Sequence, residues 1–338
     1  MLKTISIEQF MAQKSHYALI IDARSPKEYN ESKIPNAHNY FALSDDEHHE
    51  VGTVYKQNSK SKAKIIGASY ICQNASKHIK KIYETCPIGS KIAVYCARGG
   101  LRSTSIGTIL SLSGYRIEKI DRGYKDYRKF VLAYLENFPH KKFITLGGNT
   151  GCGKSELLQK LEPALDIEAL ANHFGSTFGS ILGEQPNQKE FQNNICEKLM
   201  SINTNAWIFV EGESKKLGKI IQPDRLYAKI HDSIRIEVTA PLHQRVVRIL
   251  KDYVDIDESF FLQSMQTITP YIKKEAKIEA IEAFYKQDLA KVAEILLVQY
   301  YDKVYKKPQK IDFSIDTGNM QAALENLQAI HTELSNIS

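Results

Sequence analysis

The feature that most constrains the fold is a glycine-rich octapeptide at residues 148–155, with the sequence GNTGCGKS. It matches the phosphate-loop pattern G-x4-G-K-[ST] in full. An apolar run at residues 143–146 precedes it, and a helical pattern that begins at Glu156 follows it. Such a loop joins a buried parallel strand to a helix, so we expect the second half of the chain to be an α/β domain of the P-loop NTPase-like kind.

The phosphate loop brings its own ligand chemistry. Its glycines let backbone N–H groups converge on phosphate oxygens, Lys154 adds a mobile positive charge, and Ser155 can ligate Mg²⁺ if a metal is present. The pattern does not specify a nucleotide, because any diphosphate ester satisfies the same donors, and the use of ATP or Mg²⁺ stays open. The residues expected to bind phosphate are Gly148, Asn149, Thr150, Gly151, Cys152, Gly153, Lys154 and Ser155.

Further elements of a parallel sheet are expected in this half. Residues 206–210 and 233–238 are short apolar runs typical of strands, and the chain is mostly helical from residue 241. Glu211 and Glu213 follow the first of these runs, as in a Walker B strand. Because ligands bind at the carboxyl ends of strands in such sheets, both carboxylates are candidates to orient water or a metal ion.

A second reactive loop is expected in the first half. Residues 18–22 and 91–95 read as buried parallel strands, and Cys96 follows the second directly, ahead of a helical pattern at residues 103–112. A thiol at such a turn faces backbone N–H groups and the positive end of a helix dipole, and both favour the thiolate. We therefore predict that Cys96 is catalytic. The residues expected to complete an anion cradle around it are Arg98, Gly99, Gly100, Arg102 and Ser103.

The cysteine loop leaves two chemistries open. A thiolate in such a cradle suits a nucleophile that attacks, or carries, a group derived from an oxyanion. The spacing Cys-x5-Arg-Ser also fits phosphatases that form a cysteinyl phosphate. The other four cysteines lack this setting, and no two of the five stand at CxxC spacing, so neither a disulfide framework nor a zinc site is expected.

The two halves are predicted to be separate domains, each a mainly parallel sheet flanked by helices. A strand at residues 115–120 and a helix at 124–136 close the first domain, which spans residues 1–136. The segment NFPHKK at residues 137–142 breaks the helical pattern and is the expected linker, and residues 143–338 form the second domain. The polar residues 44–50 are expected to lie in a loop.

Composition adds weaker constraints. The net charge of +6 permits a polyanionic partner without requiring one. No apolar run approaches the ~20 residues that a membrane helix needs, and the N-terminus has no signal-peptide pattern, so a cytoplasmic protein with no membrane partner is expected. One lysine-rich stretch near the C-terminus is expected to be a solvated face: Lys303, Lys306, Lys307 and Lys310.

Two resemblances sharpen this interpretation. Residues 20–29 and 34–39 resemble the opening signature of rhodanese domains, in which the aspartate and arginine, here Asp22 and Arg24, hold the fold together. A rhodanese domain followed by a P-loop domain resembles the tRNA 2-selenouridine synthase family. Five segments are similar to that family: residues 51–57, 95–103, 172–179, 210–214 and 301–305.

This resemblance implies a transferase that acts on tRNA carrying 2-thiouridine at the wobble position of the anticodon loop. It implies a geranyltransferase step from geranyl diphosphate to sulfur, and a selenotransferase step in which selenophosphate supplies selenium, with a selenophosphate-supplying enzyme as a further partner. The phosphate loop would hold the diphosphate, with His173, Ser176, Glu211 and Glu213 nearby, and the Cys96 loop would receive the selenium donor. The alternative is a rhodanese-type sulfurtransferase, or a cysteine phosphatase-like enzyme, fused to an ATP-binding kinase-like domain.

Overall fold

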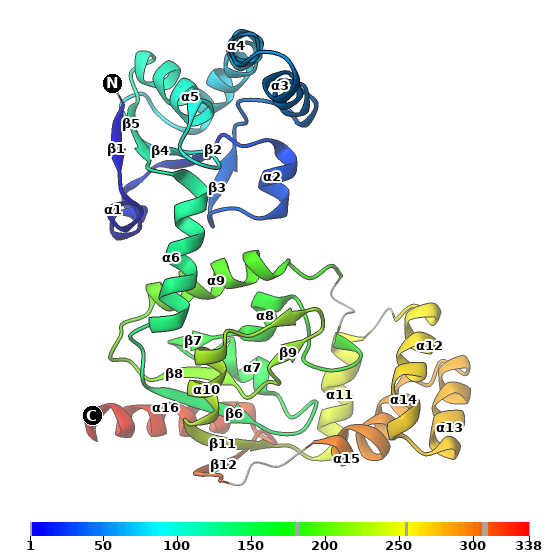
Figure 1. Cartoon of the computed structure of the whole chain (residues 1–338). Coiled ribbons are helices and arrows are strands. Elements are labelled where there is room, and N and C mark those ends of the chain that lie inside the picture. Colours follow the sequence, from blue (N-terminus) through cyan, green and yellow to red (C-terminus); the bar gives the residue numbers. More distant parts are fainter. Residues whose placement is uncertain (1, 180–182, 254–255, 306–309, 338) are drawn as a thin grey trace. The chain divides into compact units, whose positions relative to one another are not determined.

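The chain folds into two compact units. The computed structural model describes residues 2–179, 183–253, 256–305 and 310–337. Unit 1 comprises Met1–Leu135 and Gln192–Cys196, and unit 2 comprises Glu136–Phe191 and Glu197–Ser338 (Figure 1). The predicted linker is not an exposed tether, since Phe138 and His140 within it are buried and the His140 ring lies 3.1 Å from the carbonyl oxygen of Ile202.

Unit 1 is built on a five-stranded sheet in the order β1-β5-β4-β2-β3, in which every neighbouring pair is parallel. Its strands are β1 (Lys3–Ile5), β2 (Leu19–Asp22), β3 (Ala37–Asn39), β4 (Lys91–Tyr95) and β5 (Arg116–Ile120). Its helices are α1 (Ile7–Ala12), η1 (Lys14–His16), α2 (Pro26–Glu31), α3 (Asp45–Gln57), α4 (Lys60–Thr85), α5 (Leu101–Leu112) and α6 (Gly123–Asn137). The parallel sheet with flanking helices confirms the predicted fold class for this half.

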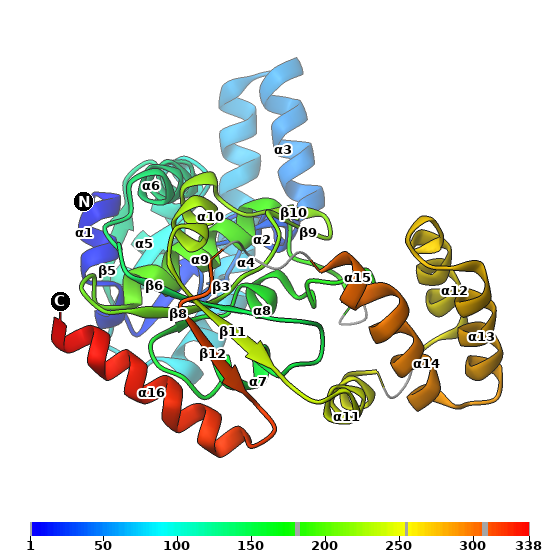
Figure 2. The ribbon, with the colours of Figure 1, turned by 90° about the horizontal axis from the view of Figure 1, so that it is seen from below.

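The prediction of a loop at residues 44–50 is wrong. Ser44 caps α3, and its side chain accepts from the backbone of Glu47 while the Glu47 carboxylate accepts from the backbone of Ser44. Asp45 and Asp46 add negative charge to the first turn, where the helix dipole is positive. The polarity of this stretch is that of a helix start, and α3 packs beside the long helix α4 (Figures 1 and 2).

Unit 2 has a second five-stranded parallel sheet, in the order β12-β11-β6-β8-β7, and a separate antiparallel pair, β9 and β10. Its strands are β6 (Phe143–Gly147), β7 (Ala164–Leu165), β8 (Ile208–Glu211), β9 (Lys216–Leu217), β10 (Ile220–Ile221), β11 (Ile234–Thr239) and β12 (Phe313–Asp316). The sequence analysis missed β12, which lies in the region expected to be mostly helical. The central strand is β6, which leads directly into the phosphate loop.

The helices of unit 2 are mostly short. They are α7 (Lys154–Leu158), α8 (Ile167–Ala171), α9 (Gln188–Ser201), α10 (Asp224–His231), α11 (Leu242–Asp252), α12 (Glu258–Thr267), η3 (Thr269–Tyr271), α13 (Lys274–Tyr285), α14 (Leu289–Leu296), η4 (Leu297–Tyr301), α15 (Asp302–Val304) and α16 (Met320–Ile337). The middle of α9, Gln192–Cys196, is counted with unit 1. Helices α12, α13 and α14 gather into a bundle beside the sheet, with a hydrophobic core of their own (Figures 1 and 2).

Two sequence expectations concern surface properties. None of the helices that the structure describes combines the length and the apolar character that a membrane crossing requires. In the lysine-rich stretch, Lys303 donates to Gln299, and Lys310 forms an ion pair with Asp312. Lys306 and Lys307 lie outside the described residues.

Candidate active site

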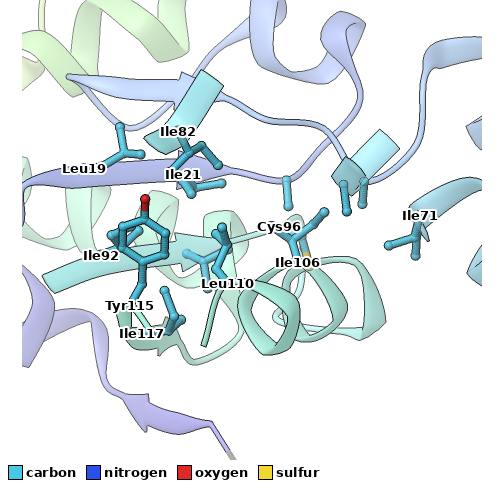
Figure 3. Close-up of a cluster of buried hydrophobic side chains, with 14 of the residues drawn as sticks. Leu19, Ile21, Ile71, Ile82, Ile92, Cys96, Ile106, Leu110, Tyr115 and Ile117 are labelled. Carbon is cyan, nitrogen blue, oxygen red and sulfur yellow. The ribbon is translucent and has the colours of Figure 1, made fainter. Parts of the chain in front are cut away.

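Cys96 lies at the turn between β4 and α5, as the sequence predicts. Its side chain is almost fully buried, with 2% exposed, and packs alongside Ile106 in the hydrophobic cluster of unit 1 (Figure 3). Two donors face the sulfur: the backbone N–H of Gly100 and the hydroxyl of Ser103, each 3.2 Å from Sγ. The sulfur therefore has two hydrogen-bond donors, and it is closed off from solvent in this arrangement.

The two arginines of the loop differ. Arg98 is exposed, and within the part of the chain that the structure describes it forms no ion pair. Arg102 is bound to Glu28 through two hydrogen bonds, so its charge is already matched by a carboxylate. Burial opposes ionisation of Glu28, but the hydrogen bond and charge of Arg102 outweigh it and hold the pKa of Glu28 below its usual value. Arg98 is therefore the arginine whose charge is available to an incoming anion.

The Cys96 loop is held in place by its backbone. Gly99 has φ of +65°, and a Cβ there would lie 2.8 Å from the backbone nitrogen of Arg122, so only glycine fits this turn. The ammonium group of Lys119 donates to the carbonyl oxygen of Gly99 at 3.1 Å. Helix α5 begins at Gly100 without any side-chain cap, which leaves its first N–H groups directed at the loop.

Asp22 and Arg24 have the structural role that the rhodanese resemblance implies. Both side chains are buried, and the Arg24 guanidinium donates to both carboxylate oxygens of Asp22. The hydroxyl of Tyr95 donates to the same carboxylate at 2.7 Å, and Arg24 also lies over the ring of Tyr124. A buried ion pair with its hydrogen bonds satisfied fixes the chain next to β2.

The phosphate loop lies between β6 and α7: residues 148–153 form the turn, and Lys154 and Ser155 are the first two residues of α7. Gly148 has φ of +139°, and a Cβ there would come within 2.2 Å of the carbonyl oxygen of Val238. The ammonium group of Lys154 donates to the carbonyl oxygen of Gly148 at 2.8 Å. Cys152 is buried in the core cluster of this unit, which fits its predicted role as a small filler residue.

The sequence analysis missed the group that braces the phosphate loop. The guanidinium of Arg245, on α11, donates from Nε to the carbonyl oxygen of Thr150 at 2.9 Å and pairs with both carboxylate oxygens of Asp302. Asp302 also accepts from the side-chain amide of Asn149 at 2.8 Å. Asn149 therefore holds the shape of the loop through its side chain. Asp302 belongs to a segment singled out by resemblance, whereas no motif marks Arg245.

A buried acid beside the loop was also missed. The hydroxyl of Ser155 donates to Glu168 at 3.2 Å, and the backbone N–H of Gly175 donates to the other oxygen of the same carboxylate. Burial, and next the charge of Glu213, raise the pKa of Glu168 to about 8. Burial opposes the charge of Lys154, but Cys152, Glu213 and Glu168 together raise its pKa above the usual value. The sequence around Glu168 contains no motif that could have found it.

The predicted residues His173 and Ser176 lie in the segment that packs against these acids. His173 is nearly buried, its Nδ1 atom has no hydrogen-bond partner among the described residues, and burial lowers the pKa of its ring. The Ser176 hydroxyl interacts with Tyr301. The structure therefore brings His173 and Glu213 together near Lys154, with Glu168 among them.

Glu211 lies deeper than the other acids. It is fully buried at the end of β8, where Oε2 accepts from the backbone N–H of Ile167 at 3.1 Å and Oε1 has no partner among the described residues. Burial raises the pKa of Glu211 well above its usual value, and the nearby carboxylates of Asp166, Glu168 and Glu213 act in the same direction. In the described ranges no three His, Cys, Asp or Glu side chains are placed to hold a metal ion, and Mg²⁺ at Ser155 stays a prediction.

Comparison with known proteins agrees with this arrangement. Residues 6–130 match the family model of the rhodanese-like domain, and residues 141–280 match that of the tRNA 2-selenouridine synthase AAA domain. A tRNA 2-selenouridine synthase of Psychromonas ingrahamii is 34% identical over 69% of this chain and 64% of its own length. That of Hydrogenovibrio crunogenus is 30% identical over 91% of this chain and 94% of its own.

The extent of these matches varies. The matched region spans less than two thirds of the Psychromonas protein and of a Nitrosomonas europaea relative, which is 33% identical over 70% of this chain and 63% of its own length. A crystal structure of the N-terminal domain of a Clostridium difficile 630 protein is 36% identical, covering 38% of this chain and 99% of its own, with a TM-score of 0.35. The sequence matches and the two domain models decide the assignment: this chain belongs to the tRNA 2-selenouridine synthase family.

Proposed function

We propose that the protein is a transferase that replaces sulfur by selenium in the wobble 2-thiouridine of tRNA, by way of an S-geranyl-2-thiouridine intermediate. The observation that carries the proposal is the presence of two glycine-rich turns between strand and helix in one chain, one with the thiol of Cys96 and one with the ammonium group of Lys154. Family membership supports tRNA as the substrate, because the matched relatives are named tRNA 2-selenouridine synthases.

The first step is assigned to unit 2. The thiocarbonyl sulfur of 2-thiouridine forms a bond to C1 of the geranyl group, the C1–O bond breaks, and the electron pair leaves on the diphosphate. The N3 proton of the base is released to solvent. Lys154 and the N–H groups of residues 148–155 stabilise the negative charge that develops on the diphosphate. Glu168, with a pKa of about 8, is mostly protonated at pH 7, which limits its repulsion of this charge.

The second step is assigned to the Cys96 loop. Selenium forms a bond to C2 of the base, the C2–S bond breaks, and geranylthiolate leaves and takes up a proton. Water takes the phosphoryl group of selenophosphate, which is released as phosphate. Alkylation of the sulfur makes this exchange possible because a thiolate is a better leaving group than the sulfur of a thiocarbonyl. Arg98 attracts the selenium donor, and the N–H of Gly100 and the hydroxyl of Ser103 stabilise negative charge next to Cys96.

Binding of tRNA draws on the positive charge of the chain. The net charge of +6 favours association with a polyanion, and contacts to phosphates supply much of the affinity of such complexes. The anticodon loop offers unpaired bases that a protein can unstack and read. An enzyme that makes selenophosphate is the further partner that this chemistry requires.

Nucleoside mass spectrometry of tRNA tests the proposal directly. We expect cells that lack the gene to have no 2-selenouridine, with 2-thiouridine remaining at the wobble position. Complementation with the intact gene should restore 2-selenouridine. Persistence of 2-selenouridine in the deletion strain, with no second gene of this family present, would contradict the proposal.

One observation favours a second candidate, a rhodanese-type sulfurtransferase. Residues 6–130 match the rhodanese-like model, and the donors around Cys96 also suit a persulfide. Incubation with thiosulfate and cyanide distinguishes the two, because a sulfurtransferase releases thiocyanate rapidly. We expect thiocyanate release to be slow and unchanged by tRNA.

A further inference from the structure

An apolar cavity in unit 2 lies next to the phosphate loop. Thr150 of that loop forms part of its lining, and the remaining walls come mainly from helices α11, α12, α13 and α14. The walls include Ile249, Phe261, Phe284 and Leu296. Figures 1 and 2 show these helices grouped beside the end of the sheet. The cavity therefore adjoins the phosphate loop at Thr150.

The segment that braces the loop also lines the cavity. Leu297 and Tyr301 line the cavity and are the first and last residues of η4, a π-helical turn. The next residue, Asp302, pairs with Arg245 and accepts from the amide of Asn149 in the phosphate loop. Because π-helical turns in proteins are frequently associated with functional sites, this one is an independent sign that the cavity is used.

The lining determines which ligands the cavity can hold. Among the residues that the structure describes, no charged side chain lines it, and the polar lining residues are Thr150, Tyr253 and Tyr301. Burial raises the pKa of Tyr301, so that hydroxyl stays neutral, and the Tyr253 hydroxyl donates to the carbonyl oxygen of Phe178. A nucleobase needs several polar partners, and this lining offers few, whereas a hydrocarbon chain needs none.

We propose that this cavity holds the hydrocarbon chain of a diphosphate ester whose head group is bound by the phosphate loop. The inference rests on the proposed function, because it concerns the same diphosphate site, and it adds the position of the chain and the residues that select it. Thr150 marks the junction between the head group and the chain. The ligand class is an isoprenoid or alkyl diphosphate, held at one end by charge and at the other by burial of apolar surface.

The size of the cavity limits the length of the hydrocarbon chain that it can bind. Its volume is about 60 Å³, which is smaller than an engineered cavity of ~150 Å³ that binds benzene. A chain of ten carbons therefore fits only when the side chains that line the cavity move apart. The side chains at the far walls, such as Phe284 and Leu296, then set how long a chain can be.

Binding measurements on the full-length protein test the proposal. The probes are inorganic diphosphate, which carries the head group alone, and dimethylallyl, geranyl and farnesyl diphosphates, each titrated by calorimetry. We expect geranyl diphosphate to bind at least about tenfold more tightly than inorganic diphosphate. Equal affinity for the two would overturn the proposal, because the chain would then contribute nothing.

A pair of matched variants locates the chain. Ala293 lines the cavity, whereas Ala276 is buried in the same bundle and does not. We expect Ala293→Leu to reduce the advantage of geranyl over inorganic diphosphate to less than about threefold, with the affinity for inorganic diphosphate unchanged. Ala276→Leu should keep the full advantage. If Ala293→Leu retains it as well, the chain binds elsewhere and the inference is wrong.

A third variant keeps the test valid if Ala293→Leu does not fold. Leu296→Ala enlarges the cavity, and we expect it to improve the affinity for farnesyl relative to geranyl diphosphate by about fivefold or more. An unchanged ratio would contradict the proposal. The proposed function can fail separately: chain-length selection without any change in tRNA nucleosides would support the cavity assignment and refute the tRNA reaction.

Discussion

The two reactive loops are built alike and present their reactive groups differently. Each follows a buried strand of a parallel sheet and leads into a helix whose N-cap is a glycine without a side-chain cap, Gly100 in one loop and Gly153 in the other. The sulfur of Cys96 is nearly sealed, however, whereas Lys154 and Ser155 in the phosphate loop are partly exposed. The two loops thus share their position between a strand and a helix. The reactive side chain is buried in one loop and partly exposed in the other.

The glutamates beside the two loops have pKa values that are shifted in opposite directions. Near Cys96, the pKa of Glu28 is lowered because the Arg102 charge outweighs the effect of burial, so one positive charge of the loop is already neutralised. Beside the phosphate loop, burial and the charge of Glu213 raise the pKa of Glu168 to about 8, which leaves the positive charge of Lys154 available to an anion. Under the proposed function, an anion can reach the phosphate loop as it stands, whereas the Cys96 loop must open first.

Removal of the Cys96 thiol should give the largest change in reaction rate. It also tests whether the two loops act independently. We expect Cys96→Ala to reduce selenation to below about one-thousandth of its original rate, while S-geranyl-2-thiouridine still forms within about twofold of normal. Nucleoside mass spectrometry of reacted tRNA measures both products. Cys86→Ala is the matched control, since Cys86 is buried to the same degree in the same cluster. Equal loss of both products in Cys96→Ala would contradict the division of roles.

The second largest effect should come from the lysine of the phosphate loop. We expect Lys154→Ala to weaken binding of inorganic diphosphate about 100-fold, because it removes a partly buried charge that contacts the anion directly. Calorimetric titration gives the dissociation constant. Lys160→Ala is the control, because Lys160 is exposed and pairs with Glu156 on the surface. A change of less than threefold in Lys154→Ala would show that the loop does not hold the diphosphate.

A change of pH should affect the phosphate loop with a predictable sign. Glu168 has a pKa of about 8, so it is mostly protonated at pH 7 and mostly ionised at pH 9. Ionisation adds negative charge beside the bound anion, and we expect the affinity for diphosphate to fall by about fivefold between these values. In Glu168→Gln this additional loss should disappear. In Glu325→Gln, a control that alters an exposed carboxylate on α16, it should remain. The same pH profile in all three proteins would contradict the assignment.

The same carboxyl gives a dependence of stability on pH. Between the usual pKa of 4.5 and the raised value of about 8, folded Glu168 keeps a proton that the unfolded chain releases. The free energy of unfolding therefore falls as pH rises through this window. Urea denaturation at several pH values should show a smaller decrease for Glu168→Gln than for the unaltered protein.

The smallest effect is expected at the exposed arginine of the Cys96 loop. Arg98→Ala should raise the KM for selenophosphate about threefold, and added salt should reduce the difference, because an exposed charge is screened. Steady-state kinetics at two salt concentrations measures both. Lys80→Ala removes an exposed positive charge on α4 and should leave KM unchanged. An effect of Arg98→Ala that is independent of salt would indicate a role other than attraction of the anion.

The sequence predicted those features that depend on local chemistry. The glycines of residues 148–155 require a particular backbone, so the strand, turn and helix around Lys154 followed from the pattern alone. Cys96 was placed correctly for the same reason, at the turn after β4. The loop predicted at residues 44–50 was an error of interpretation, because Ser44 and Glu47 form a capping box that marks a helix start.

Features that depend on distant parts of the chain were not predictable. Glu168 and Arg245 reach the phosphate loop from α8 and α11, and neither carries a motif. The burial of Cys96 depends on packing of α4 and α5 against the sheet, which a strand-to-helix pattern does not reveal. The apolar cavity requires four helices to pack around Thr150, so no local pattern indicated where a hydrocarbon chain would bind.

The most direct test of the two-site account uses tRNA that already carries S-geranyl-2-thiouridine. With selenophosphate present, we expect Lys154→Ala to convert this tRNA to 2-selenouridine at the rate of the unaltered protein, because the phosphate loop has no further role. Cys96→Ala should leave the geranylated nucleoside unchanged. Failure of Lys154→Ala on this substrate, or turnover by Cys96→Ala, would contradict the account.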